Sequence, residues 1–200
     1  MTYGYDGLNR LTSAVESGAT TNTYRYQYDR VGNRLDGGRS YDAANQVIGW
    51  SYDAAGNLRS DGTTTYSYDA LNRAIITGST SNSYNADGVL VQHGTTRYVQ
   101  DLAAPLSQIL SDGASTSVYG QERLYALQGS ARTWYATDAL GSVRQTPNDS
   151  GAVSNNTFYD PRGQVQGGSI PTFGFTGELQ QGRNVYLRAV VQWAHRHVYK

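Results

Sequence analysis

The sequence predicts an all-β fold made of repetitive antiparallel β-hairpins, and three observations lead to this prediction. The 200 residues include 17 Tyr and 23 Gly, which favour strands and turns respectively. Of the 16 acidic residues 13 are Asp, and of the 16 basic residues 15 are Arg, so the Glu and Lys that usually fill solvated helix faces are nearly missing. A short motif that begins with Tyr-Asp also recurs along the chain. A chain of this length can form one domain with a substantial core.

The recurring motif is Tyr-Asp, followed within four residues by Asn or Gly and then by Arg or an apolar residue. Five copies and one Asn variant begin at Tyr5-Asp6, Tyr28-Asp29, Tyr41-Asp42, Tyr52-Asp53, Tyr68-Asp69 and Tyr84-Asn85. From Tyr28 onward the copies are 13, 11, 16 and 16 residues apart. Because this spacing is irregular, the length variation must lie in loops.

Each copy has the features of a β-hairpin. Aromatic residues two positions apart precede the Asp, as in Tyr26 and Tyr28, and a period of two places both on one face of a strand. The Asp carboxylate can accept backbone amide bonds and start a turn, and the Asn or Gly after it tolerates a positive φ. A lone hairpin is marginally stable, so neighbouring hairpins must join into a wider sheet. We expect a curved, incomplete sheet with tyrosines packed on one another, and open edges that invite self-association.

Composition argues against several classes of function. The net charge is zero, so nothing draws the whole chain to nucleic acid or to an anionic membrane. Cysteine is absent, which excludes disulfides and thiol chemistry. No apolar run has the length of a transmembrane helix, and residues 1–14 do not resemble a signal peptide. Since the chain begins directly on a repeat-like segment, we expect it to start inside a longer array.

The histidines give a weak metal signal. His195 and His197 lie two residues apart, a spacing that places two ligands on one side of an extended strand. However, no cysteine is present, and His93 is the one other histidine. We therefore favour a solvated tail, and the sequence predicts no metal site and no cofactor.

Three further segments continue the pattern beyond the repeats. They contain Asp138, Leu140, Gly141, Ser142 and Arg144, then Asp160, Pro161 and Gly163, then Gly177 and Glu178. Together with the Tyr-Asp copies they resemble the RHS/YD repeats and the RHS-associated core. That family includes bacterial RHS proteins, wall-associated polymorphic toxins, a component of insecticidal toxin complexes and the animal teneurins. The resemblance suggests repeat hairpins in residues 1–96, core-like hairpins in 97–189 and a divergent tail in 190–200.

The resemblance also implies a function. In that family the repeats wind into a hollow β-shell that can enclose a polypeptide, often a toxin, outside the cell or in the cell envelope. We therefore expect a structural, non-catalytic segment whose partners are the remaining repeats of a larger shell and a polypeptide cargo. In many members a segment beyond the core releases an effector by self-cleavage. This sequence departs from the family after Ala189, in a way that resembles a truncation or a reading-frame slip, so we do not expect self-cleavage here.

Alternatives remain open for individual sites. Asp138 and Arg144 could form a pair in the shell interior, although a turn in which Asp138 bonds backbone amides is the simpler interpretation. The glycan sequons at Asn148 and Asn155 lie in a stretch typical of an exposed loop, and we interpret them as accidental. A groove lined with Tyr, Asn, Asp and Arg could bind carbohydrate, which is the second hypothesis for function. A glycan-acting enzyme is the third, because 13 Asp could supply a carboxylate pair.

Overall fold

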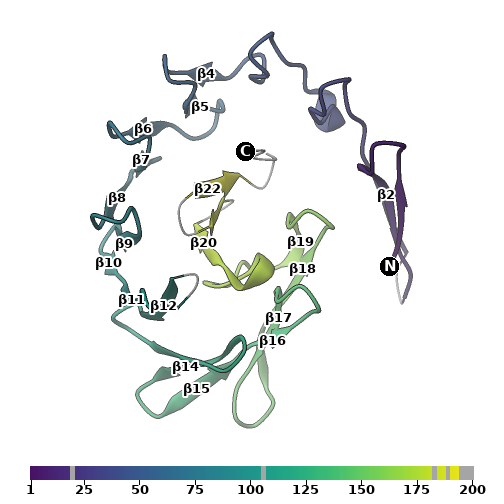
Figure 1. The fold of residues 1–200 in the computed structure, drawn as a ribbon. Helices are drawn as coiled ribbons and strands as arrows, with labels where there is room; N and C mark the ends of the chain where they lie inside the picture. The colour runs from purple at the N-terminus through teal and green to yellow at the C-terminus, as the bar shows by residue number, and fades with distance from the viewer. Residues whose placement is uncertain (19–20, 105–106, 182–183, 188–189, 194–200) are drawn as a thin grey trace. The chain divides into compact units, whose positions relative to one another are not determined.

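A computed structural model of the chain describes residues 1–18, 21–104, 107–181, 184–187 and 190–193 (Figure 1). These residues form strands and turns, with two short 3-10 segments at Asp36–Gly38 and Phe175–Gly177 and no α-helix. The pairing of the strands is antiparallel throughout the described ranges. The prediction of an all-β fold built from antiparallel hairpins is therefore confirmed. Within the same ranges, no helix has the length and apolar character needed to cross a membrane.

Contacts between Cα atoms divide the chain into two compact units, Met1–Tyr66 and Ser67–Lys200. The first unit has a three-stranded sheet in the order β1-β2-β3 and a two-stranded sheet β4-β5. Its strands are β1 (Thr2–Tyr5), β2 (Leu11–Glu16), β3 (Asn22–Arg25), β4 (Ser51–Tyr52) and β5 (Leu58–Ser60). Between the two sheets, single bridges join Tyr28 to Arg34 and Tyr41 to Val47. The borders expected after residues 96 and 189 follow motifs and not contacts, and they stay predictions.

The second unit contains sheets of five, five, four and three strands, each in simple sequential order. The first has β6 (Tyr66–Tyr68), which begins at the border of the units, β7 (Ala74–Thr77), β8 (Thr80–Tyr84), β9 (Leu90–His93) and β10 (Thr96–Arg97). The second has β11 (Val99–Asp101), β12 (Gln108–Ser111), β13 (Thr116–Tyr119), β14 (Arg123–Gln128) and β15 (Ala131–Trp134). The third has β16 (Ala136–Thr137), β17 (Val143–Pro147), β18 (Val153–Tyr159) and β19 (Val165–Gly168). The last has β20 (Leu179–Gln181), β21 (Asn184–Leu187) and β22 (Val190–Trp193).

The described strands thus form six separate sheets, because the hydrogen-bonded ladder is interrupted between them. Many strands are only two to four residues long, and most pairings contain a bulge or end after a few residues. A bulge twists the local strand and limits the length of a ladder. Successive hairpins must therefore be held together by more than backbone pairing.

One turn geometry recurs in the described residues, and we call it the Asp/Asn turn, numbered from its Asp or Asn as position 1. The Oδ1 atom of position 1 accepts the amides of positions 3 and 5 at 2.8–3.0 Å in eight turns, which begin at Asp6, Asp29, Asp42, Asp53, Asp69, Asp138, Asn148 and Asp160. In a ninth turn, Asn85 accepts the amide of position 5 at 2.9 Å. Position 4 has a positive φ and is always Asn or Gly, for example Asn72 with φ 59° and Gly88 with φ 79°. This need explains the Asn and Gly of the motif.

The core follows the same numbering. In five turns the apolar side chain at position 6 is buried, namely that of Val47, Leu58, Ala74, Leu90 or Val143, whereas Val153 at position 6 of the Asn148 turn is exposed. In the second unit the largest apolar cluster combines Leu90 with residues distant in sequence, namely Ile109, Phe173, Leu179 and Tyr186. The core of this unit therefore depends on contacts between separate hairpins.

Candidate functional site

Several successive hairpins are joined by the tyrosine that precedes an Asp/Asn turn, namely Tyr28, Tyr41 and Tyr84. The hydroxyl of Tyr28 donates to the carbonyl of Leu11 at 2.8 Å, and the hydroxyl of Tyr84 donates to the carbonyl of Ala74 at 2.9 Å. Each acceptor is position 6 of the preceding turn. The tyrosine thus ties its hairpin to the backbone of the hairpin before it, which is a function that stacking of rings alone would not supply.

An arginine at position 5 strengthens two of these junctions. The Nε of Arg10 pairs with Asp6 at 2.7 Å, its Nη1 donates to the carbonyl of Asp29 at 2.9 Å, and its guanidinium carbon lies 4.7 Å from the ring centre of Tyr28. Arg73 repeats the arrangement toward the hairpin that follows it. One side chain therefore bonds both its own turn and the next one, and a cation over a tyrosine ring adds to the attraction.

The repeat residues named from the sequence do not converge on one place. Each Tyr-Asp pair serves its own turn, and the tyrosines at positions 28, 41, 52 and 68 are half-buried, whereas Tyr5 is 58% exposed. In the first unit, including its border, the buried tyrosines among the described residues are Tyr26 and Tyr66, two positions before Tyr28 and Tyr68. Each Tyr-Asp pair thus contacts its own turn or a neighbouring hairpin, and that the repeat signature is purely structural stays a prediction.

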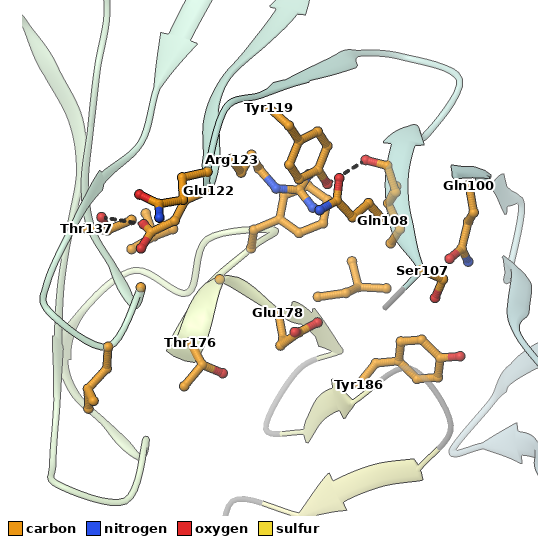
Figure 2. A pocket seen from close by; sticks show the side chains of 18 residues that line it. Gln100, Ser107, Gln108, Tyr119, Glu122, Arg123, Thr137, Thr176, Glu178 and Tyr186 are labelled. Atoms are coloured by element: carbon orange, nitrogen blue, oxygen red, sulfur yellow. Dashed lines mark hydrogen bonds between the residues drawn. The ribbon is translucent and has the colours of Figure 1, made fainter. Parts of the chain in front are cut away.

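Several segments of the second unit do converge, on a pocket of about 200 Å³ (Figure 2). Its lining includes Tyr119 and Arg123 of the β13–β14 hairpin and Leu140 at the tip of an Asp/Asn turn. Residues near the end of the described chain, including Phe173 and Tyr186, also line it. Residues more than sixty positions apart therefore share this pocket.

Arg123 lies against the aromatic part of the pocket. Its guanidinium carbon is 3.2 Å from the ring centre of Phe173 and 4.9 Å from that of Tyr119, and its Nη1 donates to the hydroxyl of Ser117 at 2.6 Å. The ring centre of Tyr135 is 6.0 Å away, and burial raises the pKa of the Tyr135 phenol, so this ring stays neutral. The guanidinium group of Arg123 thus lies close to three aromatic rings.

Two carboxylates also line the pocket. The Oε2 of exposed Glu122 accepts the hydroxyl of Thr137 at 3.1 Å, and Glu178 is half-buried. Neither a histidine nor a cysteine lines the pocket, and the described residues contain no group of three His, Cys, Asp or Glu side chains that could bind a metal ion. The arrangement offers hydrogen-bond donors and acceptors beside an apolar surface, which suits the binding of a polar or peptide group.

Four residues of the core motifs line this pocket, namely Leu140, Gly141, Gly177 and Glu178. Asp138 lies beside it, where its Oδ1 accepts the amides of Leu140 and Ser142 at 2.9 and 3.0 Å and its Oδ2 lies 3.7 Å from Arg144. Asp138 is thus both a turn acceptor and a partner of Arg144, and the location of this pair in a shell interior stays a prediction. Ser142 is fully buried.

The remaining core-motif residues are placed elsewhere. Asp160, Pro161 and Gly163 form their own Asp/Asn turn, in which a Cβ on Gly163 would collide with the ring of Phe175. None of the three lines the pocket. The motif segments are therefore neighbours in one unit without sharing one site.

The sequence did not point to several parts of this unit. Tyr119, Arg123 and Phe173 belong to no repeated motif, and although Tyr119 and Arg123 pair within one hairpin, no local pattern brings Phe173 to them. The turn at Asn148 was also missed, although Asn148 and Gly151 have the same spacing as Asp and Gly in the other turns. The spacing of Asn and Gly was thus a usable signal, and the sequon at Asn148 coincides with a structural turn.

A smaller polar and aromatic group, which we call the Trp134 platform, joins two hairpins of the second unit. The rings of Tyr125 and Trp134 lie 4.7 Å apart, and the indole nitrogen of Trp134 donates to Asp149 at 2.8 Å. Arg132 pairs with the same carboxylate at 3.3 Å. Arg132 and Asp149 are 45% and 51% exposed. The platform therefore presents aromatic surface beside exposed charges.

The histidines stay apart from these sites. The Nδ1 of His93 lies 2.7 Å from the Oδ1 of Asn82, whose amide nitrogen donates to the carbonyl of Ala74. Because that orientation makes Oδ1 the acceptor, Nδ1 of His93 carries the proton. Burial lowers the pKa of His93. His195 and His197 lie outside the described residues, so the metal hypothesis for them is not addressed.

Comparison with solved structures finds proteins that contain a similar fold. The chain matches a crystal structure of TcdB2-TccC3-TEV with a TM-score of 0.58 and 13% identity, over 96% of this chain and 11% of that one. It matches the Photorhabdus luminescens Tc holotoxin pore, a structure that carries a TccC3 variant, with a TM-score of 0.50 and 12% identity, over the same shares of the two chains. The chain has an RHS-like fold.

The likeness is one of fold alone, because the identities are low. The chain spans about a tenth of the length of these two structures, so it corresponds to a part of such a chain. No protein-family model matches the sequence, and no curated protein matches it.

Proposed function

We propose that this chain is a structural segment of a β-shell wall that encloses a polypeptide, and that it acts without catalysis. The observation that carries the proposal is the repeated junction between hairpins, in which a tyrosine hydroxyl, and in two cases an arginine, bonds the backbone of a neighbouring hairpin. Such junctions suit a wall that can be extended by further repeats. The likeness to Tc toxin chains, of which this chain spans about a tenth, supports a role as part of a larger assembly.

A second observation supports a polypeptide as the occupant. In the second unit, the apolar side chains Leu90 and Ile109 of the hairpins are covered by Phe173, Leu179 and Tyr186 of the same chain. This surface is thus already suited to contact an extended polypeptide through aromatic and aliphatic side chains. The family that the motifs resemble also suggests an extracellular or cell-envelope location, which belongs to the same proposal.

The proposal can be tested with a photo-crosslinking amino acid at Leu140, which is 64% exposed and lines the pocket. The probe is reduced, carboxymethylated lactalbumin, a permanently unfolded polypeptide, and folded lactalbumin is the competitor. We expect crosslinks from Leu140 to the unfolded probe. Leu124, which is 44% exposed and does not line the pocket, is the matched control position. Equal labelling from both positions, or none from Leu140, would contradict the proposal.

Carbohydrate binding is a second candidate, and the Trp134 platform is the observation that favours it. Aromatic rings beside an exposed Asp and Arg can stack on a sugar ring and bond its hydroxyls. A glycan array should then show binding tighter than millimolar that is lost in Trp134→Ala. Binding that survives this substitution would remove the platform from consideration. Hydrolysis of a bound glycan that is lost on substituting Glu122 would instead favour an enzyme.

A further inference from the structure

The turn Gly174–Glu178 repeats the two backbone hydrogen bonds of an Asp/Asn turn, but it has no side chain at position 1, and its position 3, Thr176, has a φ of 53°. The amide of Gly174 donates to the carbonyl of Glu178 at 2.9 Å, and the amide of Gly177 donates to the carbonyl of Gly174 at 3.0 Å. Position 4, Gly177, has a φ of 74° as in the other turns. In those turns, position 3 donates its amide to the Asp or Asn side chain, so Gly174 leaves the amide of Thr176 without that acceptor.

Ser142 supplies the missing acceptor from a different turn. The amide of Thr176 donates to the Oγ of Ser142 at 3.0 Å, which is the same length as the bond between position 3 and a carboxylate elsewhere. Ser142 is itself position 5 of the Asp138 turn, and its side chain is fully buried. A second bond between the two turns runs from the amide of Val143 to the carbonyl of Gly174 at 2.9 Å. Two turns 34 residues apart are therefore locked together.

Glycine at positions 174 and 177 permits this close approach. A Cβ on Gly174 would lie 2.7 Å from Cγ of Gln180, and a Cβ on Gly177 would lie 3.3 Å from the carbonyl oxygen of Gly141. A turn with its own Asp at position 174 would meet the first obstacle. Gly174 therefore supplies no carboxylate to its own turn, and Ser142 of the Asp138 turn supplies the acceptor in its place.

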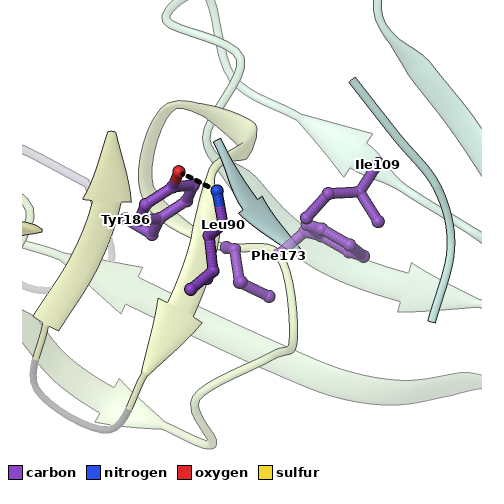
Figure 3. Packing of buried hydrophobic residues seen from close by; sticks show 5 residues of the cluster. Leu90, Ile109, Phe173 and Tyr186 are labelled. Atoms are coloured by element: carbon purple, nitrogen blue, oxygen red, sulfur yellow. Dashed lines mark hydrogen bonds between the residues drawn. The ribbon is translucent and has the colours of Figure 1, made fainter. Parts of the chain in front are cut away.

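We propose that Ser142 and the Gly174–Glu178 turn form an intramolecular clasp that docks residues 173–181 and 184–187, the docked segment, onto the hairpins of the second unit. The docked segment contributes Phe173, Leu179 and Tyr186 to the apolar cluster, where the hydroxyl of Tyr186 accepts the amide of Leu90 at 2.8 Å (Figure 3). It also contributes residues to the lining of the pocket. Release of the clasp opens the cluster and the pocket together, while the hairpins keep their own bonds. This inference does not depend on what the wall encloses.

Residue-resolved hydrogen exchange tests the clasp in the unmodified chain. The amides of Thr176, Val143 and Leu90 donate to acceptors across the docking interface, so a clasp makes them open together. We expect these three amides to have matching protection factors and one common dependence on denaturant. Openings at clearly different denaturant concentrations would overturn the proposal without any variant.

The variant Ser142→Ala removes the acceptor and leaves the amide of residue 142 free to bond Asp138 as before. Loss of this acceptor should lower the protection of Thr176 and also of Leu90 by on the order of tenfold or more. Ser142→Cys, with a weakly accepting sulfur of similar size, should act in the same direction. Ser150→Ala is the matched control, because its hydroxyl bonds only within an exposed turn. Lower protection at Thr176 with unchanged protection at Leu90 would show a local bond and overturn the clasp, and so would unchanged protection at both.

Discussion

At the scale of single residues, the first position of the Asp/Asn turn does most to determine local structure. Its carboxylate accepts two amides that would otherwise lack a partner inside the turn, and those bonds favour the charged form. In Asp69, the amide of Arg73 is the largest cause of a pKa below the ordinary value, and in Asp53 the side-chain amide of Asn57 is the largest cause. Asn85 and Asn148 show that an amide oxygen can take the same place without a charge.

The turn at Asp160 allows a direct test of this function. Asp160 is buried, and its Oδ1 accepts the amides of Arg162 and Gln164 at 2.8 and 2.9 Å. Asp160→Ala leaves both amides without this acceptor and should lower the free energy of unfolding by about 1–3 kcal/mol. Asp160→Asn keeps the accepting oxygen and should cost less. Urea unfolding of the two variants measures the difference, and equal losses would show that the charge matters more than the acceptor.

At the scale of elements, hairpins are short and depend on bonds to their neighbours. The junction through Tyr28 combines a hydroxyl bond to Leu11 with the guanidinium of Arg10 over the ring. Tyr28→Phe keeps the ring and removes only the hydroxyl, so we expect a loss of about 0.5–1.5 kcal/mol in the free energy of unfolding. Tyr5→Phe, at a tyrosine that is 58% exposed, is the control and should stay within about 0.5 kcal/mol of the parent. A Tyr28→Phe variant as stable as that control would remove the hydroxyl from the junction.

Two glycines allow the effect of backbone conformation on stability to be measured apart from the effect of close packing. Gly151 and Gly168 have φ values of 82° and 83°, but a Cβ on Gly151 would meet nothing within 4 Å, whereas a Cβ on Gly168 would overlap the carbonyl oxygen of Asn156. Gly151→Ala should cost about 1–2 kcal/mol, because only the left-handed conformation is penalised. Gly168→Ala must also displace the pairing of β18 with β19, and we expect about 4 kcal/mol or more, or loss of folding. Thermal unfolding compares them, and similar melting temperatures would contradict the close approach.

At the scale of the whole molecule, aspartate carboxylates limit stability at low pH and buried tyrosine phenols limit it at high pH. Asp6, Asp53 and Asp69 have pKa values lowered from 3.8 in the folded chain, so the stability that they contribute is present above that value and is lost as the pH falls through the lowered ones. Burial raises the pKa of Tyr84 and Tyr98 from 10.0 to about 12, so their contribution is present below pH 10 and is lost as the pH rises toward 12.

We therefore expect the free energy of unfolding to fall below about pH 4 and above about pH 10. Denaturant titrations at a series of pH values measure this profile. Absorbance at 295 nm should show a group of tyrosines that ionise only near pH 12, together with unfolding. Complete ionisation of all tyrosines near pH 10 without unfolding would contradict the burial of these two phenols.

The sequence predicted the local architecture well, because the bonds that define it span few residues. Asp69, Asn72 and Arg73 lie within five positions, and the carboxylate, the positive φ and the ion pair all form inside that window. The strand expected through Tyr26 and Tyr28 is shorter than predicted, because it ends at Arg25 and Tyr28 forms a single bridge to Arg34. The place of Arg123 among three rings was only partly readable, because Tyr119 lies opposite it in the same hairpin, whereas Phe173 comes from a distant part of the chain.

The sequence by itself determined the all-β class, the recurring hairpin and the positions of its turns, since Asp, Asn and Gly define each turn through backbone bonds only four residues long. Only the tertiary structure decided which turns dock on each other. The bond from Thr176 to Ser142 spans 34 residues and the bond from Leu90 to Tyr186 spans 96, and neither leaves a local pattern. Such contacts depend on shape and burial after the hairpins have formed, so the pocket and the clasp belong to the folded molecule and not to any one motif.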